Sequence, residues 1–189
     1  MKTFWLILAL SLTTSSASAA ELASAADAPP GPALLDGVWK LDWDRSDSFE
    51  PGMKALETPW LLRRLAGIAR VRVELRAEAK PSDCQDCAEK IKVVLTTPIK
   101  TQKVEAVLDG KPRPGKTLTG RATLDRYTWT SEGGLEMIRE YELPSGSQAR
   151  IRDIRSLGAD PDTMLSQITI WVDDTERASA LRTFIRTSD

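Results

Sequence analysis

Residues 70–80 alternate between apolar and charged side chains, and this two-residue period constrains the fold more than any other feature of the chain. Val71, Val73 and Leu75 are separated by Arg72 and Glu74. Successive side chains of a β-strand point to opposite faces, so the pattern predicts a strand with one buried face and one wet face. Similar patterns predict strands over residues 91–95, 104–108, 118–124, 126–131, 135–143, 148–157, 164–172 and 178–186.

Short linkers rich in Gly, Pro, Ser and Asp separate many of these segments, for example residues 133–134, 144–147 and 158–162. Such residues form tight reversals, so consecutive strands are expected to pair antiparallel. A meander of this many strands removes its exposed edges by closing. We therefore predict a mainly β fold, a ten-stranded antiparallel up-and-down β-barrel. In its segment 118–124, the alternating apolar set is Leu118, Gly120, Ala122 and Leu124.

Only residues 49–57 and 59–69 have apolar residues at the spacing of three or four that is typical of helices. Asp47 with Glu50 resembles a capping box, and Pro59 suits the first position of the second helix. Residues 37–41 ahead of them read as the first strand. The expected order is one strand, two helices and then nine strands.

The N-terminus has the pattern of an export signal. Lys2 precedes an apolar run over residues 4–12, and Ala17-Ser18-Ala19 fits the small-residue cleavage site. We expect a signal peptide over 1–20, a disordered leader over 21–34 and a single domain over 35–189. In a diderm bacterium the product would be periplasmic or secreted.

Composition excludes several classes of site. The chain has 26 basic and 27 acidic residues, two cysteines and no histidine. This near-neutral charge does not favour nucleic acid, and the absence of histidine removes Ser-His-Asp catalysis and imidazole metal sites. No catalytic residue, metal site or cofactor is expected. Asp153, Glu140 and Tyr141 are the residues available for acid–base work, but no motif pairs two carboxylates.

Several segments resemble the intracellular fatty-acid-binding proteins, a branch of the calycins. The stretch Gly37-Val38-Trp39-Lys40-Leu41 is similar to the opening motif of that family. Residues 48–56 and 59–67 are similar to its two helices, and residues 181–184 to the Thr-Arg-x-Tyr of its last strand. The resemblance implies a ten-stranded barrel with a two-helix lid between strands 1 and 2, and non-catalytic binding of a lipid carboxylate. The export signal departs from this cytosolic family.

The resemblance also implies site residues. Arg182 matches the arginine that binds the ligand carboxylate, and Arg155 is the positional candidate for its companion. Phe184 stands where the family has a tyrosine, and Tyr141 is the candidate to replace its hydroxyl. From the alternation alone, Arg139 and Tyr141 share the face of Leu135 and Met137.

Alternatives remain open for these residues. Arg155 can pair with Asp153, and Arg139 and Arg182 can reach the barrel rim. Leu181 and Ile185 form a competing apolar face that would turn Arg182 outward. Core or lid packing competes with ligand stacking for the tryptophans Trp39, Trp43, Trp60, Trp129 and Trp171.

Cys84 and Cys87 are expected to form a small disulfide in the hairpin after Lys80, if the protein is exported. Thiol redox chemistry and metal binding are the competing interpretations. Redox chemistry is disfavoured because Asp83 and Asp86 would raise the thiol pKa.

The sequence therefore predicts an exported monomer that binds a small hydrophobic or amphipathic ligand, a fatty acid or similar carboxylate. Lys54, Arg63 and Arg64 give the helices a basic side, which suits transient membrane contact. The alternative is an envelope protein–protein interaction module whose barrel is filled by side chains. A cavity too small for a ligand would favour that alternative.

Overall fold

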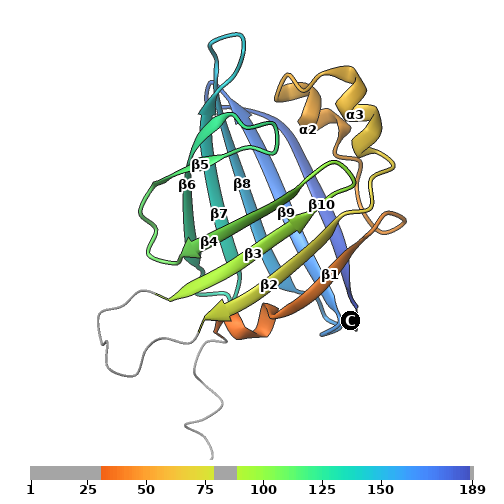
Figure 1. The fold of residues 1–189 in the computed structure, drawn as a ribbon, viewed down its shortest axis with the longest axis vertical. Coiled ribbons are helices and arrows are strands. Elements are labelled where there is room, and N and C mark those ends of the chain that lie inside the picture. Colours follow the sequence, from red (N-terminus) through yellow and green to blue (C-terminus); the bar gives the residue numbers. More distant parts are fainter. Residues whose placement is uncertain (1–30, 79–88, 188–189) are drawn as a thin grey trace, which may run out of the picture.

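The protein is described by a computed structural model that covers residues 31–78 and 89–187. One antiparallel sheet contains all ten strands in the order β4-β3-β2-β1-β10-β9-β8-β7-β6-β5 (Figure 1). The strands are β1 (Gly37–Asp42), β2 (Arg72–Glu78), β3 (Lys90–Thr96), β4 (Thr101–Val107), β5 (Arg113–Lys116), β6 (Ala122–Trp129), β7 (Leu135–Glu142), β8 (Gln148–Leu157), β9 (Thr163–Val172) and β10 (Thr175–Thr187). The helices α2 (Glu50–Ala55) and α3 (Trp60–Ala66) lie between β1 and β2. The predicted strand count and helix position are confirmed.

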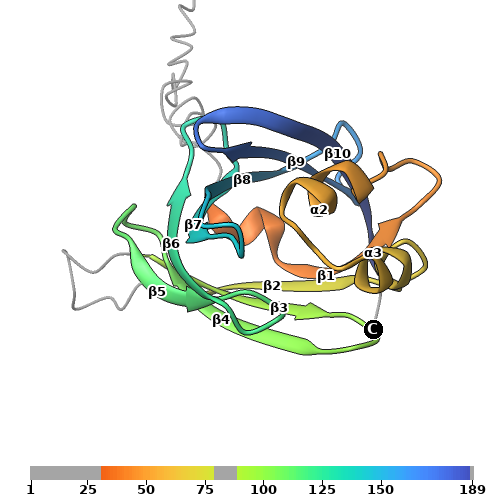
Figure 2. The same cartoon turned by 90° about the horizontal axis from the view of Figure 1, so that it is seen from above.

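The sheet curls around a core, but it does not close completely (Figure 2). β1 pairs with β10, whereas β4 and β5 are the two ends of the strand order. Side chains bridge this seam: Gln102 Nε2 donates to the Lys116 carbonyl at 2.6 Å, and Lys100 Nζ donates to the Leu118 carbonyl at 3.1 Å. The predicted closure is therefore corrected to a curled sheet whose edges meet through side chains, which still shields them from other chains.

Both helices are shorter than the sequence predicts. α2 ends before Glu57, whose positive φ of 53° is incompatible with a continuing α-helix. α2 contacts β9 and β10, and it covers part of the barrel mouth when seen from above (Figure 2). Gly52 permits this approach, because a Cβ there would lie 2.7 Å from the Ile170 side chain.

A short 3-10 helix, η1 (Pro32–Leu35), lies at the opposite end of the barrel (Figure 1). Leu35 is fully buried, and its carbonyl accepts a hydrogen bond of 2.9 Å from Trp39 Nε1. The expected leader over 21–34 overlaps the described part of the chain at 31–34, where the backbone already forms this helix. The expected signal peptide and residues 21–30 lie outside the described residues.

One strand assignment from the sequence is wrong. Residues 118–124 and 126–131 are not separate strands: β5 begins earlier, at Arg113, and β6 runs from Ala122 to Trp129. Pro114 hides the strand pattern of β5 in the sequence. Proline is tolerated at this position because β5 is an edge strand. The shift reverses the expected face, since Leu124 is 49% exposed and Asp125 only 5% exposed.

The main core lies inside the curl. Its buried members from β1, β2, β3, β9 and β10 include Trp39, Leu75, Ile91, Met164 and Phe184. Within the described residues, no helix is long and apolar enough to cross a membrane. Cys84 and Cys87 lie outside the described residues.

Candidate functional site

Arg139 on β7 points into the barrel and is held by Asp125 on β6. Its Nε and Nη2 donate to the two carboxylate oxygens at 2.9 and 2.7 Å. Burial alone would lower the pKa of Arg139, but the hydrogen bonds and charge of Asp125 outweigh burial and raise it. This guanidinium already has a bidentate anionic partner.

Arg155 on β8 is also paired. Its Nη2 donates to Asp153 Oδ2 at 2.7 Å, and Ser166 donates to Asp153 Oδ1 at 2.6 Å. Asp153 is 5% exposed, so this group of three side chains lies inside the barrel wall. The alternative in which Arg155 pairs with Asp153 is the arrangement present in this structure.

Arg182 on β10 differs from both. It is 7% exposed, and its Nε has no hydrogen-bond partner among the described residues. Its guanidinium carbon lies 4.8 Å from the centre of the Trp43 ring and 6.0 Å from that of Phe49. Burial lowers the pKa of Arg182, and the charge of Asp47 opposes this shift only partly. Arg182 is thus a buried cation between aromatic rings, without an ion pair to any described acid.

Phe184 and Tyr141 belong to the two hydrophobic clusters of the barrel. Phe184 faces the interior as part of the main core, whereas Leu181 on the same strand is 42% exposed. This fixes the face of β10 that the sequence left open. Tyr141 packs against a second, smaller core cluster with Leu143 and Ala149, and burial raises its pKa.

An interior cavity of about 100 Å³ brings Arg139 and Arg155 together. Its apolar wall consists of Val93, Leu95, Val104, Leu135 and Met137, and its polar wall of Gln102, Tyr127, Arg139, Asp153 and Arg155. Arg182 does not line it, but pairs across the sheet with Ser166, which pairs in turn with Arg155. Arg182 and Arg155 therefore lie at one level of the sheet, whereas Arg139 pairs with Ile151, four residues along β8 from Arg155.

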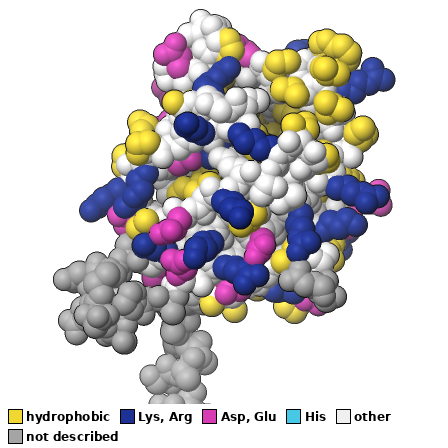
Figure 3. Space-filling view, viewed as in Figure 1, with side chains coloured by type: hydrophobic (Ala, Val, Ile, Leu, Met, Phe, Trp, Pro, Cys, Tyr) yellow, Lys and Arg dark blue, Asp and Glu magenta, His cyan; other side chains and the backbone are white. Residues whose placement is uncertain are grey.

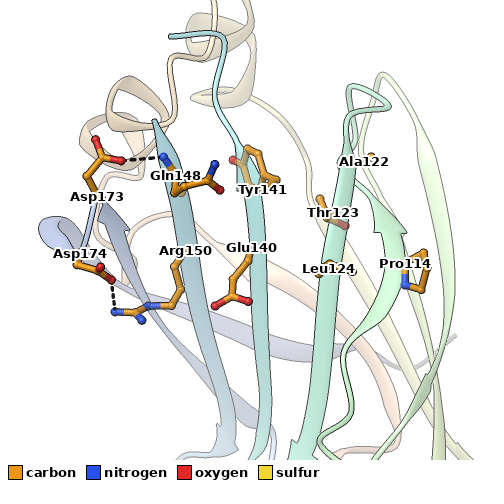
Figure 4. A pocket seen from close by; sticks show the side chains of 11 residues that line it. Pro114, Ala122, Thr123, Leu124, Glu140, Tyr141, Gln148, Arg150, Asp173 and Asp174 are labelled. Atoms are coloured by element: carbon orange, nitrogen blue, oxygen red, sulfur yellow. Dashed lines mark hydrogen bonds and ion pairs between the residues drawn. The ribbon is translucent and has the colours of Figure 1, made fainter. Parts of the chain in front are cut away.

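A larger open hollow of about 840 Å³ is lined by residues from both faces of β6, β7 and β8, among them Thr123, Glu140, Tyr141 and Arg150 (Figure 4). Arg150 on its surface pairs with Asp174 at 3.6 Å, and Asp173 accepts a hydrogen bond from the Gln148 backbone. Glu140 there pairs with Arg126 at 2.6 Å. Each of these four charged groups thus has a polar partner.

Among residues 31–78 and 89–187, the acidic side chains do not gather at one site. Glu140 points to the outer face, opposite to Asp153 and Tyr141. Within the described ranges, no group of three or more carboxylate or thiol side chains is placed to hold a metal ion.

The sequence did not indicate Asp125 as the partner of Arg139, nor the contacts of Trp43 and Phe49 with Arg182. Asp125 was missed because the segment was divided between residues 124 and 126. Trp43 and Phe49 precede α2, and nothing in their spacing indicates that the chain runs back along β10. In the structure, Asp47 N donates to the Leu181 carbonyl at 2.9 Å, which brings this segment against Arg182.

No family model and no curated protein matches the sequence. Solved structures do match the fold. A fatty acid binding protein of Schistosoma mansoni, in complex with arachidonic acid, is 23% identical and superposes with a TM-score of 0.60, covering 84% of this chain and 100% of that one. A secretory abundant heat soluble protein from Ramazzottius varieornatus is 16% identical with a TM-score of 0.60, covering 85% and 100%.

As-p18, an extracellular fatty acid binding protein, is 16% identical with a TM-score of 0.59, covering 84% of this chain and 99% of that one. Identities this low establish similarity of fold. The chain therefore has the calycin fold of the fatty-acid-binding proteins, as its sequence motifs indicate.

Proposed function

We propose that this protein binds a small amphipathic carboxylate, a fatty acid or related lipid, without chemical conversion, and that Arg182 binds the carboxylate. The single observation that carries the proposal is the buried Arg182 guanidinium without an ion pair to a described acid. An unpaired buried charge is unfavourable, and a ligand carboxylate would provide the missing anion in a bidentate geometry. Arg139 and Arg155 are each paired with an aspartate, and we propose that they form the polar wall of the binding site. Phe184 and Tyr141 would line the apolar part.

Titration of the delipidated full chain with dodecanoate tests this proposal. We expect saturable binding by displacement of a fluorescent fatty acid and by native mass spectrometry. Arg182→Gln should weaken binding by about tenfold or more, as expected for a hydrogen bond to a charged group. Arg177→Gln is the control, because it makes the same charge change at an exposed position of β10. Equal affinities of the two variants would exclude Arg182 as the carboxylate site.

An interaction module with a filled barrel is the second candidate, and the size of the cavity favours it. The interior space of about 100 Å³ is smaller than the roughly 300–1,000 Å³ of typical ligand pockets. In the binding function, the helices would move to admit a chain of fatty-acid length. Absence of saturable binding for every lipid class would leave the interaction module as the function.

Helix α3 is the proposed contact with membranes during ligand transfer. Trp60, the first residue of α3, and Ile68, two residues after its end, are 63% and 79% exposed, and hydrophobic side chains gather over the helices (Figure 3). Arg63 and Arg64 would add attraction to anionic lipids. Trp60→Ser should reduce co-sedimentation with phosphatidylglycerol vesicles, whereas Ile99→Ser, an equally exposed control on the β3–β4 turn, should not.

Export as a monomer, with a Cys84–Cys87 disulfide, completes the proposed function. Cleavage after Ala19 or Ala20 would deliver the barrel to the periplasm or medium. Recovery there of a chain that begins at residue 20 or 21 supports export, and an uncleaved chain in the cytoplasm contradicts it.

A further inference from the structure

The interior cavity has a polar wall with no net charge. Arg139 is neutralised by Asp125, and Arg155 by Asp153. Such a wall offers both donors and acceptors but does not attract a second free charge. The cavity is therefore suited to an uncharged polar group, in contrast to the surroundings of Arg182.

Tyr127 supplies a free hydroxyl in this wall. The side chain lines the cavity, and within the described residues nothing hydrogen bonds to its hydroxyl. Burial raises the pKa of Tyr127, so the group is a neutral O–H donor at physiological pH. The phenol thus has both of its hydrogen-bonding roles available to an occupant.

A purely hydrocarbon chain would be a poor occupant of this cavity. It would contact Val93, Leu95 and Met137 favourably, but it would displace any water from the Tyr127 hydroxyl without replacing its hydrogen bond. A buried polar group left unsatisfied costs about 1–3 kcal/mol. A site that presents such a group selects ligands that carry the complementary oxygen.

We propose that the bound carboxylate carries a second, uncharged oxygen, a hydroxyl or carbonyl, and that this oxygen binds at Tyr127 in the interior cavity. The inference rests on the proposed function and specifies its ligand as an oxygenated fatty acid. Arg182, Ser166 and Arg155 are neighbours on β10, β9 and β8, and Tyr127 lies two strands further, since it pairs with Met137 on β7. Arg182 and Tyr127 are therefore about four strand spacings apart, or roughly 20 Å along the curled sheet and less across its interior. One acyl chain can therefore reach both sites.

Matched pairs of ligands test this inference directly. Saturated fatty acids of increasing length, from octanoate to hexadecanoate, are each compared with their terminal hydroxy derivative on the delipidated full chain by titration calorimetry. We expect the hydroxylated member to bind about tenfold tighter at one or more lengths, the value of a net hydrogen bond plus a relieved unsatisfied donor.

Tyr127→Phe should abolish this preference while leaving the affinity for the plain acid unchanged or higher. Thr128→Val is the matched control: its hydroxyl is on the outer face of the same strand, where it donates to Glu136 at 3.1 Å, and the preference should persist. Equal affinity within every pair, or a preference that survives in Tyr127→Phe, overturns the inference and leaves the carrier function standing. Absence of binding by both members of every pair overturns the carrier function as well.

Discussion

Asp125 neutralises the positive charge of Arg139 inside the barrel. Its side chain is 6% exposed and neutralises Arg139, and β5 is held close to it because Gly115 has no Cβ to collide with the carboxylate. The pair thus links three consecutive strands, β5, β6 and β7. Glycine is required at position 115 by this contact and not by its backbone conformation.

Asp125→Asn should destabilise the protein by about 3–5 kcal/mol, because it leaves the Arg139 charge buried without its anion. Urea unfolding followed by tryptophan fluorescence measures the change. The double variant Asp125→Leu/Arg139→Met should recover most of the loss. Glu105→Ala, which removes an exposed partner of Lys90, should unfold at the wild-type midpoint. A wild-type midpoint for Asp125→Asn would show that the pair contributes nothing to the fold.

Arg182→Met should have the opposite effect and raise the free energy of unfolding by about 1–3 kcal/mol, because it removes a buried cation that lacks an ion pair. Chemical denaturation of the ligand-free protein is the measurement. A loss of stability would mean that stacking on Trp43 and Phe49 outweighs the burial of the charge, and that the arginine is structural.

At the scale of elements, the regular strands were predictable and the irregular segments were not. Alternation placed Arg139 on the interior face of its strand because Leu135 and Met137 form a clear apolar set beside it. It failed at β5, where proline and glycine conceal an edge strand, and therefore missed Asp125 on β6. The contact of Trp43 and Phe49 with Arg182 was unpredictable for a different reason: it depends on the loop between β1 and α2, which lies beside β10, and periodicity within a segment gives no information on such a contact.

η1 is the element whose role is most easily tested. Leu35 closes the end of the barrel away from the helices and is fully buried, whereas its neighbour Leu34 is 44% exposed. Leu35→Ala should therefore cost about 2–5 kcal/mol of stability, and Leu34→Ala should leave the unfolding midpoint unchanged. Equal effects of the two substitutions would show that η1 does not plug the barrel.

At the scale of the whole molecule, the fold separates two kinds of surface. The inside of the curl carries a small polar cavity and Arg182, which has no ion pair within the described part of the chain. The outer face of β2, β3 and β4 carries exposed ion pairs such as Lys90–Glu105 and Lys92–Glu78, and basic and acidic side chains are interspersed on the surface in Figure 3. Exposed pairs of this kind contribute little to stability. We therefore expect a bound ligand to change the free energy of unfolding mainly through contacts in the interior.

The ionisation of the bound ligand tests the central claim most directly. Dodecanoate labelled at the carboxyl carbon is followed by NMR in the presence of the full chain as the pH falls from neutrality. An adjacent guanidinium lowers a carboxyl pKa, whereas apolar burial alone raises it. We predict a bound resonance that stays at its ionised position while the free pool titrates near a carboxyl value of about 4.3. A bound resonance that titrates above the free pool, or no bound resonance at all, would contradict a carboxylate held by Arg182.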